Sequence, residues 1–384
     1  MRKQIVLTLL CIVTAHVFGS SIDYRGNQSV DYIRTLTRGG SLDAADIVIY
    51  NPAGTAMMED GFHINFGNQF IFKNYSMELD ATGTEYVSDV PTLILPNLFG
   101  VYKRNNWAGF VGAGITAGGG TVEYEDGIAY TAASGYTDCV LEATSIYYGV
   151  ILGGSYAVND MFSFSLAGRY ITSEKDIFLE GDVGFGVMDL LEVSQSATGF
   201  GAIIGLDIRP MDALNIGIKY ETETALEYEN DTTTDNVGGY TDESTFDYNL
   251  PALLSVGVAF DMTQELKINA GLVYYFIEMA EGDAYEDYDN GFDLSTGVEY
   301  RLIEPLVLSV GYMYSKMGSN SDTISDFDMS LDSHNIAAGV KYDINENIDA
   351  ILAYNYSTYP DLSNSYATYD KTTHLVAAGV NLKF

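Results

Sequence analysis

The chain has 384 residues, of which 47% are hydrophobic, and it carries 30 tyrosines, 39 glycines and a formal net charge of −35. This acidity excludes a protein that binds nucleic acids through their phosphates, because such proteins need a positive surface that releases counterions. Beyond Cys11 the sequence contains only Cys139, which excludes an internal disulfide and a cysteine-ligated metal site in the mature chain.

Residues 1–20 predict a secretory signal peptide. The cations Arg2 and Lys3 precede an apolar run, Ile5–Val13, and small residues follow it. We therefore expect the mature chain to begin near Ser20 or Ser21.

Residues 21–60 show no sustained strand periodicity, and only Val30, Ile33 and Leu36 have a faint helical spacing. The segment is rich in cations, with Arg25, Arg34 and Arg38. Two interpretations stay open: a disordered leader, or a small plug whose arginines meet acidic groups inside a barrel.

The segment ends near the tetrapeptide Asn51, Pro52, Ala53 and Gly54. Pro52 fixes φ and removes a backbone donor, and Gly54 can take a positive φ, so these residues predict a turn. We interpret this turn as the joint between plug and barrel, although an ordinary turn before a strand would have the same sequence.

Residues 61–384 consist mainly of runs in which apolar and polar residues alternate, which predicts strands with one apolar face. About 14 such runs are present, an even number, as expected for a closed antiparallel transmembrane β-barrel. The runs are Phe62–Lys73, Leu95–Lys103, Trp107–Gly118, Thr144–Val158, Met161–Ser173, Thr198–Arg209, Leu214–Tyr228, Leu250–Phe260, Leu266–Met279, Phe292–Leu302, Leu306–Lys316, His334–Tyr342, Ile348–Tyr356 and Thr373–Phe384.

The connections between these runs alternate between short and long without a break in the order. Short turns at one rim and long loops at the other are typical of outer-membrane barrels, and a soluble sandwich would not sort its loops in this way. The predicted long loops are Asn74–Ile94, Gly119–Ala143, Glu174–Ala197, Glu229–Asn249, Ala280–Gly291, Met317–Ser333 and Ser357–Thr372. They carry most of the acidic excess, so we expect them to face the outside of the cell.

The two ends of the strands carry further signals. Tyr312, Tyr314, Tyr354 and Tyr356 lie near strand ends and predict an aromatic girdle at the level of the lipid headgroups. The last run ends in Phe384, which predicts a sorting signal for the barrel-assembly machinery. The expected surroundings are outer-membrane lipid, and we expect a monomer.

The sequence lacks the motifs of the common catalytic sites. Three histidines remain after the signal peptide, His63, His334 and His374, and they lie on separate strands. No G-x-S-x-G, H-E-x-x-H or P-loop pattern is present. We therefore predict a protein that is not an enzyme and that uses no cofactor or metal.

The third predicted strand contains Gly112, Gly114, Gly118, Gly119 and Gly120. Glycines inside a strand often mark a bulge or a bend, and a kink here would open the barrel wall sideways. Close packing of the glycines against a plug is the alternative.

Several side chains are predicted to point into the lumen. The cations Arg169, Lys219 and Arg301 either pair with lumen acids or meet an anionic headgroup of a ligand. The candidate acids are Asp207, Glu221 and Glu299. Apolar residues predicted to face inward, Ile151, Ile203, Val273 and Ile351, fit a hydrophobic cargo better than a water-filled pore.

With these features the chain resembles the FadL family of outer-membrane transporters of long-chain fatty acids and aromatic hydrocarbons. The Asn51-Pro52-Ala53 motif, the Leu95-Pro96-Asn97 entry to the second strand and the glycine-rich third strand carry the resemblance. Four hairpins with a shared glycine and tyrosine pattern add to it: Gly205–Tyr220, Gly257–Tyr274, Gly297–Tyr312 and Gly339–Tyr354.

The resemblance implies a 14-stranded barrel closed by an N-terminal hatch. A hydrophobic ligand would be captured outside, bound in the lumen and released passively through a lateral opening at a kinked third strand. The acidic loops favour neutral molecules over fatty acid anions. A surface-exposed structural or adhesive barrel, whose acidic loops bind an external partner, is the alternative function.

Overall fold

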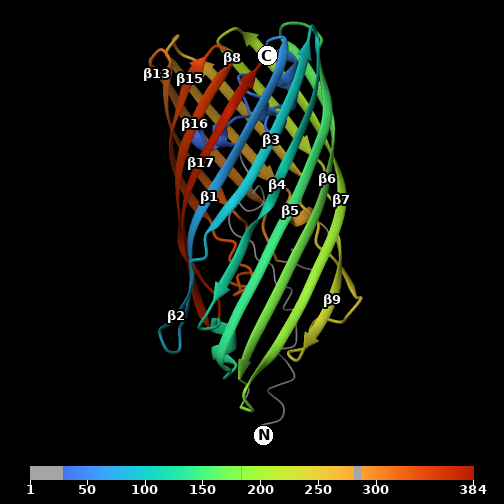
Figure 1. The fold of residues 1–384 in the computed structure, drawn as a ribbon, viewed down its shortest axis with the longest axis vertical. Coiled ribbons are helices and arrows are strands. Elements are labelled where there is room, and N and C mark those ends of the chain that lie inside the picture. Colours follow the sequence, from blue (N-terminus) through green and yellow to red (C-terminus); the bar gives the residue numbers. More distant parts are fainter. Residues whose placement is uncertain (1–28, 183, 281–286) are drawn as a thin grey trace.

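Antiparallel strands that follow one another along the chain form the wall of the computed structural model, which describes residues 29–182, 184–280 and 287–384 (Figure 1). β17 pairs with β1 from His63↔Lys383 to Leu79↔Ala367, and this pairing closes the sheet into a barrel. The predicted signal peptide and Arg25 lie outside the described residues.

Fourteen strands of the described chain form the barrel wall, which confirms the predicted fold class. They are β1 (Gly61–Leu79), β3 (Thr92–Arg104), β4 (Trp107–Tyr124), β5 (Thr137–Ala157), β6 (Phe162–Asp182), β7 (Val187–Met211), β8 (Leu214–Glu221), β11 (Leu253–Asp261), β12 (Leu266–Tyr275), β13 (Gly291–Ile303), β14 (Leu306–Lys316), β15 (Ser333–Asn345), β16 (Ile348–Ser363) and β17 (Ala367–Lys383).

The connections contain further short elements. β2 (Thr84–Ser88) pairs with β1, β9 (Glu227–Asp235) pairs with β7, and β10 (Thr245–Asp247) pairs with β9. The helical elements are α2 (Val30–Thr35), η1 (Ala45–Val48), η2 (Pro52–Met57), α3 (Ala129–Ala133) and η3 (Ile277–Met279). Within the described ranges, none of the helices is both long and apolar enough to cross a bilayer.

Side chains alternate between the lumen and the outer surface along each wall strand, as the pleat of a strand requires. In β5 the outward Val150 and Leu152 are 47% and 69% exposed, whereas Ile151 between them is 6% exposed. Ile203, Val273 and Ile351 are also buried, so all four apolar residues that the sequence assigned to the lumen are enclosed.

Several strands are longer than the sequence predicted, whereas β8 and β12 are shorter and end at Glu221 and Tyr275. The predicted loop Glu174–Ala197 is wrong, because β6 continues to Asp182 and β7 begins at Val187. Ile177 and Leu179 are buried in this extension, while the outer face carries Asp176 and Glu180 with Phe178 between them. Beyond the bilayer the outer face of a strand meets water, so the acidic residues that suggested a loop are compatible with a strand.

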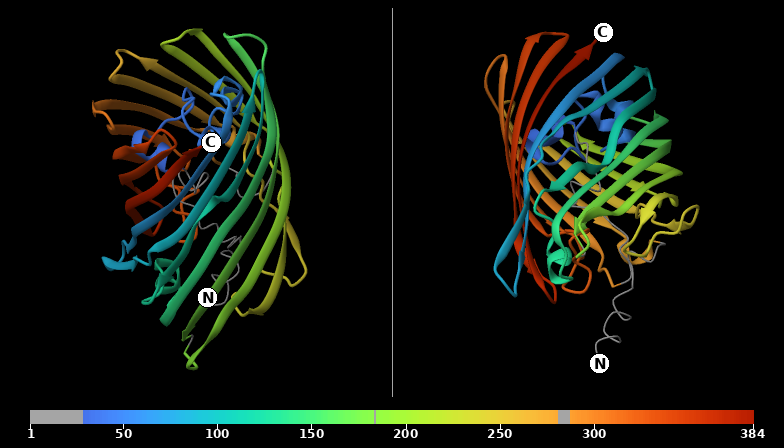
Figure 2. Two further views of the ribbon diagram at one scale, coloured as in Figure 1. Left: turned by 45° about the horizontal axis from the view of Figure 1, so that its top comes forward. Right: turned by 60° about the horizontal axis from the view of Figure 1, so that its bottom comes forward.

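The described part of the plug, residues 29–60, lies inside the barrel toward the rim with the short turns (Figures 1 and 2). Ser29 caps α2, because its Oγ accepts a hydrogen bond from Tyr32 N at 3.0 Å. Val30, Ile33 and Leu36 are fully buried and pack against apolar residues of β14 to β17. The segment is therefore a folded plug rather than a disordered leader.

Candidate functional site

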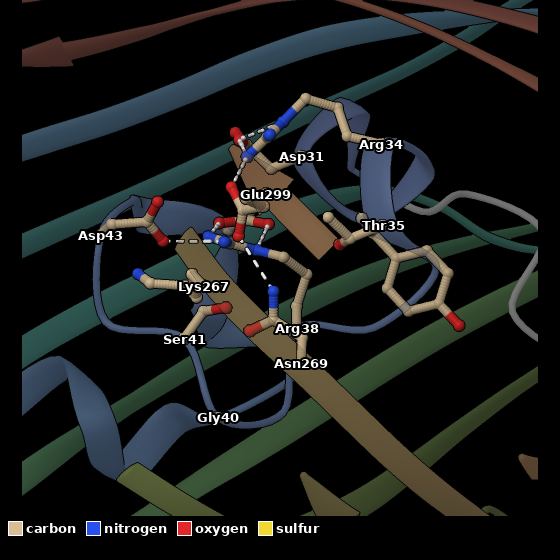
Figure 3. A network of polar contacts seen from close by, with 12 residues as sticks. Asp31, Arg34, Thr35, Arg38, Gly40, Ser41, Asp43, Lys267, Asn269 and Glu299 are labelled. Carbon is tan, nitrogen blue, oxygen red and sulfur yellow. Dashed lines mark hydrogen bonds and ion pairs between the residues drawn. The ribbon is translucent and has the colours of Figure 1, made fainter. Parts of the chain in front are cut away.

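Ion pairs between plug and wall form the floor of the lumen (Figure 3). Arg34 of α2 lies 3.1 Å from Asp31 and 3.0 Å from Glu299 of β13, and its side chain is fully buried. Asp31 also accepts hydrogen bonds from Asn65 of β1 at 3.1 Å and Asn381 of β17 at 3.0 Å. The arginine thus meets a lumen acid, as the plug interpretation predicted.

A second group of charges surrounds Arg38 (Figure 3). Its guanidinium lies 2.7 Å from both Asp43 and Asp46, and Lys341 of β15 lies 3.3 Å from Asp43. The positive charges hold the pKa of Asp43 well below its usual range despite burial. The ion pairs of these two groups therefore join the plug to two strands, β13 and β15.

The Asn51–Gly54 motif forms a turn, in which Gly54 N donates to Asn51 O at 3.0 Å, and this turn begins the 3₁₀ helix η2 instead of leading directly into β1. Asn51 caps η2 by accepting a hydrogen bond from Gly54 N at 3.2 Å, and Pro52 occupies its first turn, where no N–H is needed. Asn51 also donates to Asp207 of β7 at 2.5 Å. Gly54 is needed for space rather than for positive φ, because a Cβ there would lie 2.7 Å from Leu42 Cδ2.

Backbones of plug and wall touch where two glycines meet. A Cβ on Gly39 of the plug would lie 2.8 Å from Gly257 Cα in β11. This contact leaves no room for a side chain on either residue, so the plug fits the wall closely at this point.

An apolar cluster rich in tyrosine lines the lumen between the plug and the long loops. It contains Ala117, Tyr147, Ile171, Ala197, Leu226, Tyr228, Tyr248, Leu250, Leu253, Val273, Tyr275, Ile277 and Tyr288. Aromatic rings with hydroxyl groups suit ligands that are largely apolar. We call these residues the lumen cluster.

Lys175 of β6 extends into the lumen cluster. Its ammonium lies 4.4 Å from the ring centres of both Tyr228 and Tyr248, and 5.9 Å from that of Tyr147. Lys371 of β17 lies 4.4 Å from the ring of Tyr75. The electron-rich faces of the rings stabilise these buried cations.

The three predicted headgroup cations do not form one site. Arg169 and Lys219 both contact Glu221, and Lys219 also donates to Ile49 O of the plug at 2.5 Å. Arg301 lies at the short-turn end, 2.9 Å from Asp343, with 36% of its side chain exposed. An anionic headgroup would have to displace a carboxylate from any of the three.

Two bulges distort β4 beside the lumen cluster. Its pairing with β5 shifts in register between Ile115 and Ala117 and again between Ala117 and Gly120, so β4 contains extra residues relative to β5. Gly118 and Gly120 have φ values of 91° and 76°, which favour glycine. The kink that the glycines predicted therefore lies at residues 115–120.

On its other side, the described pairing of β4 with β3 covers only the first part of β4. The β3–β4 ladder runs from Arg104↔Trp107 to Asn97↔Gly114, and the described pairing ends there although both strands continue. Further along, a Cβ on Gly120 would lie 2.6 Å from Thr92 Oγ1, so the strands approach again. The described ladder between β3 and β4 therefore has a gap in its pairing between these two places.

The remaining predicted glycines lie either in the regular ladder or within the kink. Gly112 and Gly114 lie in the regular ladder, and a Cβ on Gly112 would lie 3.0 Å from the ring of Phe99. Gly119 belongs to β4, but its surroundings lie outside the described residues.

The histidines and the C-terminus lie away from the lumen cluster. His334 and His374 form hydrogen bonds to Tyr312 and Tyr354 at 2.8 and 2.7 Å on the outer face. Phe384 is exposed, and its backbone pairs with that of Phe62 at the short-turn rim. No group of metal-binding side chains occurs among the described residues.

Sequence reasoning missed Lys175, Lys371 and the tyrosines around them. Lys175 and Lys371 continue the inward alternation of β6 and β17, but both positions were assigned to predicted loops. Strand periodicity continued through the acidic runs would have found them.

The sequence of residues 37–383 matches the family model described as outer membrane protein transport protein (OMPP1/FadL/TodX). No curated protein matched the chain at the threshold of the comparison.

Solved structures share the fold. A FadL homologue from Pseudomonas aeruginosa is 13% identical with a TM-score of 0.75, covering 93% of this chain and 98% of its own. The toluene transporter TodX of P. putida is 15% identical with a TM-score of 0.67, covering 91% and 97%. The toluene transporter TbuX of Ralstonia pickettii is 16% identical with a TM-score of 0.65, covering 97% and 100%. From the family model, which spans most of its length, the chain belongs to the OMPP1/FadL/TodX family of outer-membrane transport proteins.

Proposed function

We propose that this chain is a passive channel that carries hydrophobic small molecules through the outer membrane, with lateral release at the kink in β4. The ligand is captured at the long loops, binds at the lumen cluster and leaves between β3 and β4. The observation that carries this proposal is the interrupted β3–β4 ladder directly beside the lumen cluster, to which Ala117 of the kink belongs.

Neutral molecules such as aromatic hydrocarbons fit this lumen better than fatty acid anions. Each of the candidate headgroup cations Arg169, Lys219 and Arg301 already contacts a carboxylate. Removing a buried charge from its partner costs several kcal/mol unless the ligand replaces it fully. Solved family members named as toluene transporters support the same substrate class.

The test straightens β4. Deleting Gly118 and Gly119 removes the two extra residues and keeps the alternation of side chains, so β4 can pair with β3 beyond Gly114. Uptake of radiolabelled toluene and of a radiolabelled long-chain fatty acid is measured in cells without their own transporter. We expect toluene uptake to fall by about tenfold or more.

The matched control deletes another glycine pair, Gly238 and Gly239, in the exposed connection between β9 and β10, where a Cβ would meet nothing within 4 Å. Heat-modifiable migration in gels shows whether each variant forms a folded barrel. Unchanged uptake by the straightened, folded barrel contradicts lateral release. Absence of uptake by the unmodified chain contradicts the transport of these compounds and favours a barrel that displays its loops.

A further inference from the structure

The connection between β14 and β15, residues 317–332, folds back into the mouth of the barrel instead of extending into water. Ile324, Phe327, Met329 and Leu331 are all buried there. Figure 2 shows this orange-red segment inside the ring of strands at the end with the long loops. We call it the 317–332 loop.

One carboxylate of this loop joins two other parts of the mouth, α3 and the start of β17 with the residue before it. Asp326 accepts hydrogen bonds from Tyr130 N in α3 at 2.6 Å, from Tyr366 OH at 3.0 Å and from Tyr369 OH in β17 at 2.7 Å. Asp326 is only 5% exposed, so these donors replace the water it would otherwise bind.

Two neighbouring groups attach the same tip to the lumen. Asp328 accepts a hydrogen bond from Tyr288 OH of the lumen cluster at 2.6 Å. Met329 O accepts one from the ammonium of Lys371 at 3.1 Å. The tip of the loop therefore lies over the lumen cluster on its outer side.

Both backbone and side-chain hydrogen bonds attach the base of the loop, the latter including Tyr314 OH to Asp332 at 2.9 Å, whereas only side-chain bonds to other segments are described at the tip. At the base, the backbone of Gly318 accepts from Asp289 N at 2.8 Å. The described hydrogen bonds from Asp326, Asp328 and Met329 to other segments each involve a side chain, and none belongs to a strand ladder. Water can replace each of these donors, so the tip can leave without breaking a strand ladder. Its buried apolar side chains then leave their packing against wall residues such as Met77 and Leu179.

We propose that the 317–332 loop is a lid that closes the outer end of the lumen, and that Asp326 is its latch. The lid opens when its tip detaches from α3, β17 and the lumen cluster, while its base stays attached. The plug closes the opposite end, so the lid controls access from outside the cell. This inference concerns entry, and it holds whichever molecule is carried.

The test measures access to the lumen with a thiol. Cys139→Ser removes the mature chain's own cysteine, and Ser173→Cys places a thiol in the lumen at a fully buried position beside Tyr228. Whole cells are treated with a large hydrophilic maleimide that does not cross membranes. We expect slow labelling in this parent and labelling at least about tenfold faster when Asp326→Ala is added.

The matched control is Asp322→Ala, which removes an exposed carboxylate of the same loop and should leave the labelling rate unchanged. A second variant, Tyr366→Phe with Tyr369→Phe, removes two donors to Asp326 while keeping the rings. It should also accelerate labelling, and it provides the test if Asp326→Ala does not fold.

Rapid labelling of the parent, or equal rates in the parent and a folded latch variant, overturns the lid. The readout needs no transport. Failure of the lid therefore leaves the proposed channel standing, and a chain without uptake can still show a latched lid.

Discussion

The two ends of the lumen bury charge in different ways. At the plug, Arg34 and Arg38 form close ion pairs with carboxylates from the plug and the wall. At the mouth, Asp326 and Asp328 accept hydrogen bonds from tyrosine hydroxyls, and Lys175 lies against tyrosine rings.

This difference teaches which end is fixed and which can open. A buried ion pair that loses one partner leaves an uncompensated charge, so the pair holds its elements together tightly. A carboxylate held by neutral hydroxyls can exchange them for water at a much smaller cost. Charge pairing thus suits the plug, and neutral donors such as those of Asp326 suit the latch of a lid.

The largest expected effect is a loss of stability at the plug end. Arg34→Met should destabilise the protein by about 3–5 kcal/mol, because Asp31 and Glu299 then remain buried without their cation. Thermal unfolding in detergent measures the loss. Arg209→Met, which removes a partly exposed pair with Asp212, should cost at most about 1 kcal/mol. Similar losses in both variants would contradict the special role of the buried pair.

A glycine at the plug tests how closely the two backbones fit. Gly257→Ala should destabilise by about 1–3 kcal/mol, because its methyl group would overlap the backbone of Gly39. The control, Gly168→Ala in β6, has nothing within 4 Å of the new Cβ and should change the free energy of unfolding little. Chemical denaturation compares the two, and equal effects would indicate that the plug yields at this contact.

At the mouth, removing a buried cation should have a much smaller effect than at the plug. Lys175→Met keeps the length of the side chain and removes the cost of burying an ammonium, so we expect a change within about 1 kcal/mol, in either direction. The same unfolding measurement as for Arg34→Met gives the comparison. A loss as large as that of Arg34→Met would show that Lys175 is as firmly paired as the plug arginines.

The smallest expected effect concerns pH. Burial raises the pKa of Asp328 to about 6, so the closed lid binds a proton more tightly than an open lid with an ordinary carboxyl group. Closure is therefore most favoured below the ordinary pKa of 3.8, weakens as the pH rises from there to about 6, and changes no further above it. The groups that face Asp328 are Tyr288, Ser330, Lys371 and Lys175.

A nitroxide attached at Asp322→Cys, in the Cys139→Ser background, reports the motion of the lid by electron paramagnetic resonance. The mobile fraction should be larger at pH 8 than at pH 5, and Asp328→Asn should remove this dependence. The same pH response in the asparagine variant would assign it to another group.

The wall was predictable from the sequence, because successive residues of a strand face the lumen and the lipid in turn. Ile151 and Leu152 are both aliphatic, but their places in the period assigned one to the lumen and the other to lipid. The same rule failed for the predicted loop after Glu174, because water replaces lipid there and the outer face becomes acidic.

The sequence predicted which residues belong to the site, but not which of them contact one another. The sequence assigned Arg169, Lys219 and Glu221 to the lumen, but which partner each would choose depends on the stagger of β6, β7 and β8. Asp326 lies in a polar stretch typical of solvated loops, and its three donors come from two segments far from it in the chain, Tyr130 and the neighbours Tyr366 and Tyr369. Local pattern contains no information about such contacts.

The seam between β1 and β17 has a consequence for biogenesis. The plug precedes the first strand in the chain, and the last strand completes the ring by pairing with that first strand. Since glycine backbones of plug and wall touch, a finished ring leaves little space through which a folded plug could be threaded. A plug that folds before the ring closes must therefore lie inside while the sheet is still open, and the C-terminal strand then encloses it.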